Sequence, residues 1–356
     1  MNDRLERLRA AMDRKGLDAV LLNSLTAIRY FSNFTSDESI VVVTKARNIL
    51  ITDFRYTIQA KEQSGNRFEI IEAAGSKQLE TVCAALHDEN AKTVGFEEDT
   101  VTFALYQSYQ KLEVSLAPFA EELNGLRIIK TADEIASLQK AQDLADRSFT
   151  ELLKVIHSGM TEKRVAAELE YIGAKLGSEG VSFDTIVGSG PNGAMCHAVP
   201  GERKLQKGDL VVLDFGCLYN GYHSDMTRTF AVGDVDDFSM KIYHIVRTAQ
   251  QKALDALKPG ITGKQLDAIA RDYIKEQGYG DCFGHSLGHG FGLLIHEMPR
   301  ASTACDMVLE PGMTITVEPG IYIEGRVGVR IEDCCVLTEN GYHDFCSSTK
   351  ELQHIE

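Results

Sequence analysis

The chain has 356 residues, which is long for one ordinary domain and suits two. Hydrophobic residues make up 44% and charged residues 25%, the balance of a globular protein. The formal net charge of −15, without a run of Lys or Arg, argues against a nucleic acid or an anionic membrane surface as partner. No stretch of about 18 apolar residues is present that could span a bilayer.

The cysteines and the first residues indicate a cellular compartment. The eight cysteines include no C-x-x-C pair and show no disulfide-framework spacing. The first 22 residues form a charged amphipathic pattern without the apolar region of a signal peptide. We therefore expect a cytoplasmic protein with free thiols.

The first ~130 residues alternate helix and strand patterns, as in an α/β domain. Leu5, Leu8 and Met12 predict one face of an amphipathic helix. Periodic segments at 82–86 and 103–112 continue the alternation. Short apolar runs typical of buried strands lie at residues 19–22, 40–43, 48–51 and 94–96.

Residues 126–133 form a short join to the second part of the chain. Thr131 or Asp133 is expected to cap a long helix that runs to Ile156, with Glu134 in its first turn. The rest divides into two similar halves, which predicts a pseudo-symmetric domain with a site between them. Helices are expected at 162–176, 237–257 and 263–276, and strands at 210–217, 222–232, 313–317 and 328–337.

Five side chains in this second part are candidate metal ligands. Each lies in an apolar strand or a Gly-rich stretch, where an unpaired charge would be costly. Four carboxylates and one imidazole suit two hard or borderline divalent cations that share a water, a site that activates water and polarises a carbonyl. The five are Asp214, Asp225, His289, Glu318 and Glu332.

The first strand pair places two of these carboxylates. Asn220-Gly221 is the strongest two-residue hairpin signal and sets the register of the flanking strands. Asp225 then opposes Gly216, and Asp214 becomes its diagonal neighbour on the same face, roughly 7–8 Å away at the backbone. The small Gly216 is expected to leave room between the two carboxylates.

The second strand pair leaves two registers open. A three-residue turn at residues 324–326 would place Glu318 opposite Glu332. A two-residue turn would put these carboxylates on opposite faces, because side chains alternate along a strand. The sequence does not decide between the two turns.

Three histidines lie within twelve residues of the segment FGHSLGHGFGLLIHE, namely His285, His289 and His296. A helix would align the first two, but four interspersed glycines make a helix improbable. We expect an extended segment in which one histidine binds metal and the others contact substrate. His197 in MCHAVPGERKL is a fourth candidate.

Two patterns near His197 are misleading. Cys196 is not expected to act as a nucleophile with His197, because adjacent residues on an extended chain point apart. The segment GSGPNG at residues 188–193 matches a dinucleotide-binding pattern, but Pro191 and the following residues do not open a helix onto a phosphate. A loop at a substrate site is the preferred interpretation.

The motifs together resemble a known family. GSGPNGAMCHAVPGERKLQKGDLVVLDFG, GYHSDMTRTFAVG, FGHSLGHGFGLLIHEMP and EPGMTITVEPGIYIEGRVGVRIED are similar to successive motifs of the Xaa-Pro aminopeptidases and prolidases, which are pita-bread metallopeptidases. The resemblance implies a creatinase-type N-terminal α/β domain over 1–128. It implies a pseudo-symmetric pita-bread catalytic domain over 129–356.

The resemblance also implies a role for each site residue. Asp214 would bind one ion, His289 and Glu318 the other, and Asp225 and Glu332 both. Glu318 would carry the proton of the attacking water. Substrate contact or stabilisation of the tetrahedral intermediate would fall to His197, His285 and His296. Tyr322 and Arg330, which match positions that line the site, would bind substrate as well.

The implied activity is that of an Xaa-Pro aminopeptidase with two divalent ions. Mn²⁺ is preferred for the oxygen-rich ligands, with Co²⁺ and Zn²⁺ as alternatives. The partner would be a peptide with proline at its second position, and the protein would be a homodimer. A dipeptide-specific prolidase is the alternative, and a metal-free peptide-binding module a remote one. Longer peptides are favoured because the site motifs contain no evident second basic residue beside Arg330 to demand a carboxylate.

Overall fold

The computed structural model describes residues 2–356. The chain divides into two compact units, one ending at Arg127 and the other spanning Ile128–Glu356. Among the described residues, no helix has both the length and the apolar character needed to cross a membrane. All eight cysteines lie in the described chain as free thiols, in agreement with their spacing.

The first unit is built on one six-stranded sheet with the order β4-β3-β2-β1-β5-β6. The predicted Leu5–Met12 face of α1 is buried. The predicted apolar strand runs are confirmed as β1, β2, β3 and β5. The strands are β1 (Ala19–Leu22), β2 (Ser39–Thr44), β3 (Asn48–Thr52), β4 (Glu69–Glu72), β5 (Thr93–Phe96) and β6 (Ser115–Pro118), and the helices are α1 (Asn2–Lys15), α2 (Leu25–Ser32), α3 (Thr57–Ser64), α4 (Ser76–Asp88), α5 (Phe103–Tyr109) and α6 (Ala120–Ile128).

The second unit begins with a well-capped helix, α7 (Ala132–Leu152). The Thr131 hydroxyl accepts a hydrogen bond from Glu134 N, while the Glu134 carboxylate accepts one from Thr131 N. Thr131 is therefore the cap, because this reciprocal pair satisfies two backbone donors at the helix start. The helix ends before Ile156, where the chain turns toward Gly159.

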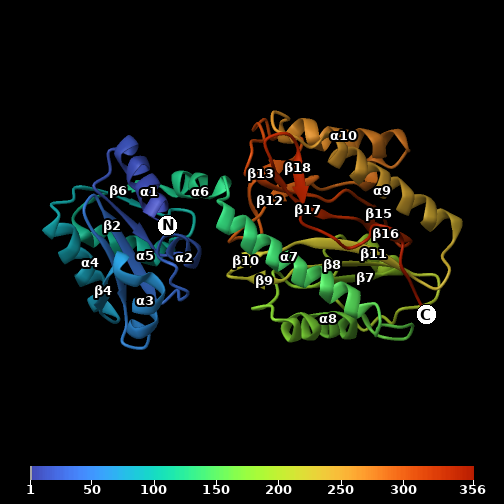
Figure 1. The fold of residues 1–356 in the computed structure, drawn as a ribbon, viewed down its shortest axis with the longest axis horizontal. Helices are drawn as coiled ribbons and strands as arrows, with labels where there is room; N and C mark the ends of the chain where they lie inside the picture. Colours follow the sequence, from blue (N-terminus) through green and yellow to red (C-terminus); the bar gives the residue numbers. More distant parts are fainter. Residues whose placement is uncertain (1) are drawn as a thin grey trace. The chain divides into compact units, whose positions relative to one another are not determined.

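Two helix pairs enclose the strands of the second unit (Figure 1). Helices α7 and α8 (Glu162–Leu176) share one apolar core with β7 (Ile186–Ser189), β8 (Leu210–Phe215) and β11 (Met226–Val232). Helices α9 and α10 share a second core with strands of the other half. The predicted division into two αβ halves is thus present as two separate cores. The remaining elements are α9 (Asp237–Ala256), α10 (Gly263–Glu276), β9 (Leu218–Tyr219), β10 (Tyr222–His223), β12 (Gly288–Gly290), β13 (Glu297–Ala301), β14 (Thr314–Val317), β15 (Gly320–Ile323), β16 (Val327–Arg330), β17 (Asp333–Leu337), β18 (Tyr342–Asp344) and β19 (His354–Ile355).

Three of the candidate metal ligands lie where a strand is interrupted. The expected strand over 222–232 breaks before Asp225, and the one over 328–337 breaks at Glu332. Glu318 lies between β14 and β15. These breaks replace the continuous strands predicted from the apolar pattern. At Glu332 the backbone N–H bonds instead to Thr227 O, in the other half of the unit.

Gly328 of β16 offers a test of the packing between the halves. A Cβ atom at this position would collide with the backbone oxygen of Gly193, and neither backbone can move freely. We expect Gly328→Ala to lower the free energy of unfolding by ~3 kcal/mol, the upper end for overpacking. Urea unfolding measures it. Gly125→Ala, at an exposed helical glycine with open space around it, is the control and should stabilise slightly; equal effects would contradict the packing argument.

Candidate metal centre and substrate pocket

The first hairpin places Asp214 and Asp225 as predicted. Asn220 and Gly221 form the turn, with φ of 49° and 65°. Tyr222 pairs with Tyr219 and, in the same register, Thr227 pairs with Asp214. The role expected for Gly216 was wrong, because a Cβ atom there would collide with the backbone of Ser224 rather than with a carboxylate.

The second strand pair has the three-residue turn. Gly320 pairs with Arg330 and Ile323 with Val327, which leaves residues 324–326 as the turn. Glu318 and Glu332 stand at opposed positions of this register, just beyond its paired residues. The three-residue alternative is therefore the correct one, and both carboxylates face the same space.

His289 lies on the short strand β12, not on a helix. Its backbone N–H donates to the Thr316 hydroxyl at 3.0 Å. Its Nδ1 lies 3.1 Å from the carbonyl oxygen of Gly290, so Nδ1 carries the proton and Nε2 faces the carboxylates. Nε2 is 3.3 Å from Glu318 Oε1 and 3.6 Å from Asp225 Oδ2.

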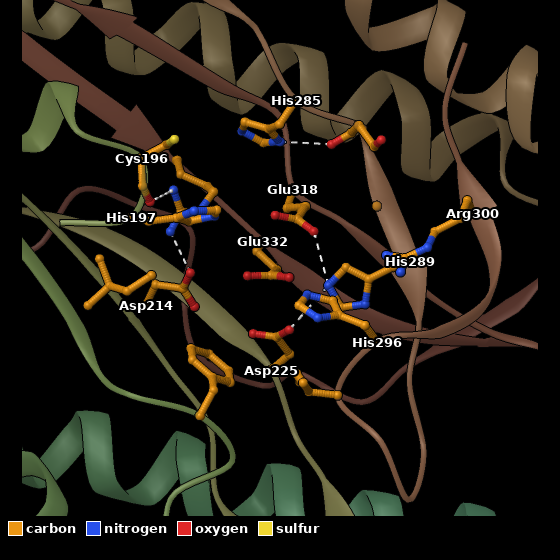
Figure 2. A pocket seen from close by; sticks show the side chains of 16 residues that line it. Cys196, His197, Asp214, Asp225, His285, His289, His296, Arg300, Glu318 and Glu332 are labelled. Atoms are coloured by element: carbon orange, nitrogen blue, oxygen red, sulfur yellow. Dashed lines mark hydrogen bonds and ion pairs between the residues drawn. The ribbon is translucent and has the colours of Figure 1, made fainter. Parts of the chain in front are cut away.

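All five candidate ligands converge on one cavity of about 290 Å³ (Figure 2). His197, His285, His296 and Arg330 line it as well, whereas Tyr322 does not. The segment at 188–193 does not line it either, although it was interpreted as a substrate loop. Seven lining residues were not among the predicted site residues: Phe183, Ile186, Cys196, Ser286, Gly288, Ile295 and Arg300.

The negative charge of the carboxylates in this cavity is only partly compensated, because Arg330 forms an ion pair with Asp214 alone. Burial raises the pKa of Glu318 to about 8. Burial, followed by repulsion from neighbouring carboxylates, raises the pKa values of Asp225 and Glu332 well above their ordinary range. Burial lowers the pKa of His289 to about 3, so this imidazole is neutral. Neutral imidazole and clustered carboxylates are a donor set for a cation.

Two buried oxygen atoms without a hydrogen-bond partner also indicate a cation site. Asp214 Oδ1 and Glu332 Oε1 are buried without a hydrogen-bond partner within residues 2–356. Asp225, His289 and Glu332 each offer a ligand atom, and these atoms lie within 4.8 Å of one another. Buried polar oxygens without partners are rare, because leaving them unsatisfied costs free energy. The residues present therefore fit divalent cations.

Arg330 is fully engaged inside the protein. Its Nη2 donates to Asp214, its Nε to the Thr227 hydroxyl at 3.0 Å and its Nη1 to Cys196 O at 3.0 Å. Nη1 also donates to the Tyr322 hydroxyl at 2.8 Å. Arg330 thus braces the metal centre. The prediction that Tyr322 contacts substrate stays a prediction.

The three further histidines differ in their freedom. Both ring nitrogens of His285 have partners, Ser286 O at 2.8 Å and the Tyr322 hydroxyl at 2.9 Å. Burial lowers the pKa of His285 to about 4. The rings of His197 and His296 face the cavity without a hydrogen bond to any described residue. These two imidazoles are available to a ligand.

A cation-binding cavity of this kind is typical of a metal-dependent hydrolase. Residues 136–339 match the model of metallopeptidase family M24, and residues 4–129 that of the creatinase/prolidase N-terminal domain. The chain therefore belongs to metallopeptidase family M24, and the predicted fold and peptidase class are confirmed.

Individual relatives of this chain are Xaa-Pro peptidases, in agreement with the family assignment. The Xaa-Pro dipeptidase of Pyrococcus furiosus is 40% identical over 356 residues, covering 99% of this chain and 100% of the relative. The solved Xaa-Pro dipeptidase of Bacillus anthracis is 43% identical with a TM-score of 0.96, covering 99% of both chains. The X-Pro aminopeptidase of Thermotoga maritima is 38% identical with a TM-score of 0.91, covering 96% of this chain and 98% of that one.

Proposed function

We propose that this protein is an Xaa-Pro dipeptidase, which hydrolyses the bond between any first residue and a C-terminal proline. This was the alternative in the sequence analysis, and two of the three relatives described above bear that name. The preference for longer peptides rested on the lack of a second basic residue. Arg300 is a second basic residue in the cavity, so the premise of the preference for longer peptides was wrong.

Arg300 is the observation that carries the proposal. It lines the cavity, and its guanidinium makes no hydrogen bond or ion pair with any residue from 2 to 356. The guanidinium of Arg330, by contrast, already donates hydrogen bonds to Asp214, Thr227 and Tyr322. An unpaired guanidinium can bind a carboxylate through two parallel hydrogen bonds. The free carboxylate of a dipeptide is such a partner, and a longer peptide has none at this place.

The proposed ligands are Asp214, Asp225, His289, Glu318 and Glu332, and the proposed ions are Mn²⁺. When bound, two such ions would polarise the scissile carbonyl and lower the pKa of a water. Glu318, whose carboxyl lines this cavity, would take a proton from the attacking water and pass it to the leaving nitrogen. His296, whose pKa is lowered by its partial burial in the cavity and by Arg300, is neutral and can donate to the carbonyl oxygen.

Steady-state kinetics with added Mn²⁺ test this proposal. Ala-Pro should be cleaved, and Ala-Pro amide and Ala-Pro-Ala at least ~10-fold less efficiently, because they lose a charge-assisted pair worth about 1.5–3 kcal/mol. Arg300→Met should reduce kcat/KM for Ala-Pro by ~10–100-fold and abolish that preference. Arg326→Met, in the exposed turn, is the control.

Equal wild-type rates on Ala-Pro and Ala-Pro-Ala would contradict the dipeptidase proposal. An Arg300→Met variant that keeps the full preference would contradict the role of Arg300. The homodimer, the cytoplasmic location and the domain limits 1–128 and 129–356 stay predictions.

A further inference from the structure

The position of the His296 ring depends on the backbone of the loop that carries it. The side chain is exposed, lines the cavity and forms no hydrogen bond within residues 2–356. Its ring stands edge-on to His289, with centroids 4.4 Å apart. An imidazole without a hydrogen-bond partner is oriented by the chain that carries it. Here that chain is the connection between β12 and β13, residues 291–296, which we call the His296 loop.

A buried ion pair lies at the base of this loop. Lys130 Nζ donates to Glu297 Oε2 at 2.8 Å, and the two side chains are only 1% and 5% exposed. The other oxygen, Glu297 Oε1, accepts from Leu294 N at 3.2 Å, inside the loop. Lys130 itself is anchored, because its backbone N–H donates to Gly312 O at 2.8 Å. One carboxylate therefore ties the loop to a fixed ammonium group.

The loop is also shaped around this pair. A Cβ atom on Gly292 would lie 2.7 Å from Glu297 Oε2 and 3.0 Å from Lys130 Cε, so the loop backbone runs close against this pair. Gly292 O accepts from His223 N at 2.8 Å, and Gly292 N donates to Leu294 O at 2.9 Å. Both ends of the loop are thus held, one by β10 and the other by the ion pair.

We propose that Lys130 and Glu297 are positioning residues that hold His296 over the metal centre. The inference rests on the proposed function, in which His296 acts on the scissile carbonyl. Burying an ion pair costs desolvation free energy that its attraction often fails to recover, so such a pair adds little stability over an apolar replacement. What this pair supplies is a defined loop geometry, and neither residue touches the cavity.

A double-mutant cycle tests this role. Glu297→Gln keeps an acceptor for Leu294 N but removes the charge, and we expect kcat for Ala-Pro to fall ~10–100-fold, as for residues that orient a ligand or catalytic group. Metal content should stay at the wild-type value. In a His296→Ala background the same substitution should change kcat less than ~3-fold, because residues that act as one unit are not additive. Equal losses in both backgrounds would overturn the proposal.

Two further variants guard against simple loss of folding. Lys130→Met combined with Glu297→Leu leaves no buried unpaired charge, so it should fold and still lower kcat to a similar extent. Ile274→Val in α10 is the control for a mild loss of core packing and should leave kcat unchanged. If the double variant is folded and has wild-type kcat, the ion pair does not position His296.

A readout independent of activity separates this inference from the proposed function. NMR of ¹⁵N-histidine-labelled protein loaded with diamagnetic Zn²⁺ in place of Mn²⁺, with the His296 signal assigned through His296→Ala, should show one sharp resonance in wild type and a shifted or broadened one in Glu297→Gln. An unchanged signal would overturn the positioning role. A wild-type protein that cleaves no Xaa-Pro peptide would overturn the proposed function, while the NMR comparison would still test the position of His296.

Discussion

Replacing Asp225 with asparagine is expected to lower kcat/KM for Ala-Pro by ~10³-fold or more. Asp225 is fully buried among Asp214, Glu318 and Glu332, and it is one of three residues whose ligand atoms lie within 4.8 Å of one another. Loss of this charge should weaken cation binding and with it several kcal/mol of transition-state stabilisation. Bound metal per chain, measured by elemental analysis, should fall in parallel.

Asp225→Asn should lower activity and metal content, but it should not lower the thermal stability of the metal-free protein. The raised pKa of Glu318 means that this carboxyl holds a proton in the folded, metal-free protein, but not in the unfolded chain, between about pH 4.5 and 8. The stability that this carboxyl contributes is therefore lost as the pH rises through this window. The Asp225→Asn substitution removes one of the repelling charges, so the metal-free variant should melt no lower than metal-free wild type at pH 8.

Thermal melts with chelator and with Mn²⁺ measure this effect. The Mn²⁺-induced rise in Tm should be smaller in Asp225→Asn than in wild type. Glu339→Gln, at an exposed position, is the control for loss of a negative charge. Wild-type metal content and activity in Asp225→Asn would show that the metal centre has been assigned wrongly.

Replacing Glu318 with glutamine should reduce kcat ~10²–10⁴-fold, the range for removing a general acid–base group. Glu318 would hold one ion and Asp225 both, so metal content should fall less than in Asp225→Asn. Saturating Mn²⁺ should therefore not restore turnover. Proton transfer, not occupancy, would then be the missing step.

Turnover at increasing Mn²⁺, alongside metal content, distinguishes the two causes. Glu324→Gln, in the exposed turn of the same strand pair, is the matched control and should behave as wild type. A Glu318→Gln enzyme within threefold of wild-type kcat at any Mn²⁺ concentration would remove Glu318 from the proposed proton transfer.

Some features of the site are determined within a few residues of sequence. Asn220-Gly221 specifies its turn because both positions take positive φ, and the register of β8 and β11 then follows residue by residue. Thr131 and Glu134 cap α7 through a four-residue pattern. The motif-based family assignment was also correct, since it rests on residue types at fixed spacing.

Other features of the site could not be predicted from local sequence patterns. The turn at residues 324–326 was ambiguous because a glycine such as Gly325 suits a two-residue or a three-residue turn, and only the pairing of β15 with β16 decided it. The strand breaks at Asp225 and Glu332 were missed because residues typical of strands flank each break on both sides. A local pattern cannot report that a backbone N–H will bond to the other half of the domain.

Arg300 shows the same limit for function. By itself the sequence predicted which residues could bind cations, because buried carboxylates and histidines in apolar strands have few other uses. That Arg300 stands beside His289 depends on the pairing of β12 with β13 across an irregular register. Contacts between segments far apart in the chain decide that Arg330 is hydrogen-bonded within the protein while Arg300 is not. The tertiary structure alone decided which guanidinium is left for a substrate, because only folding determines which charges are already paired.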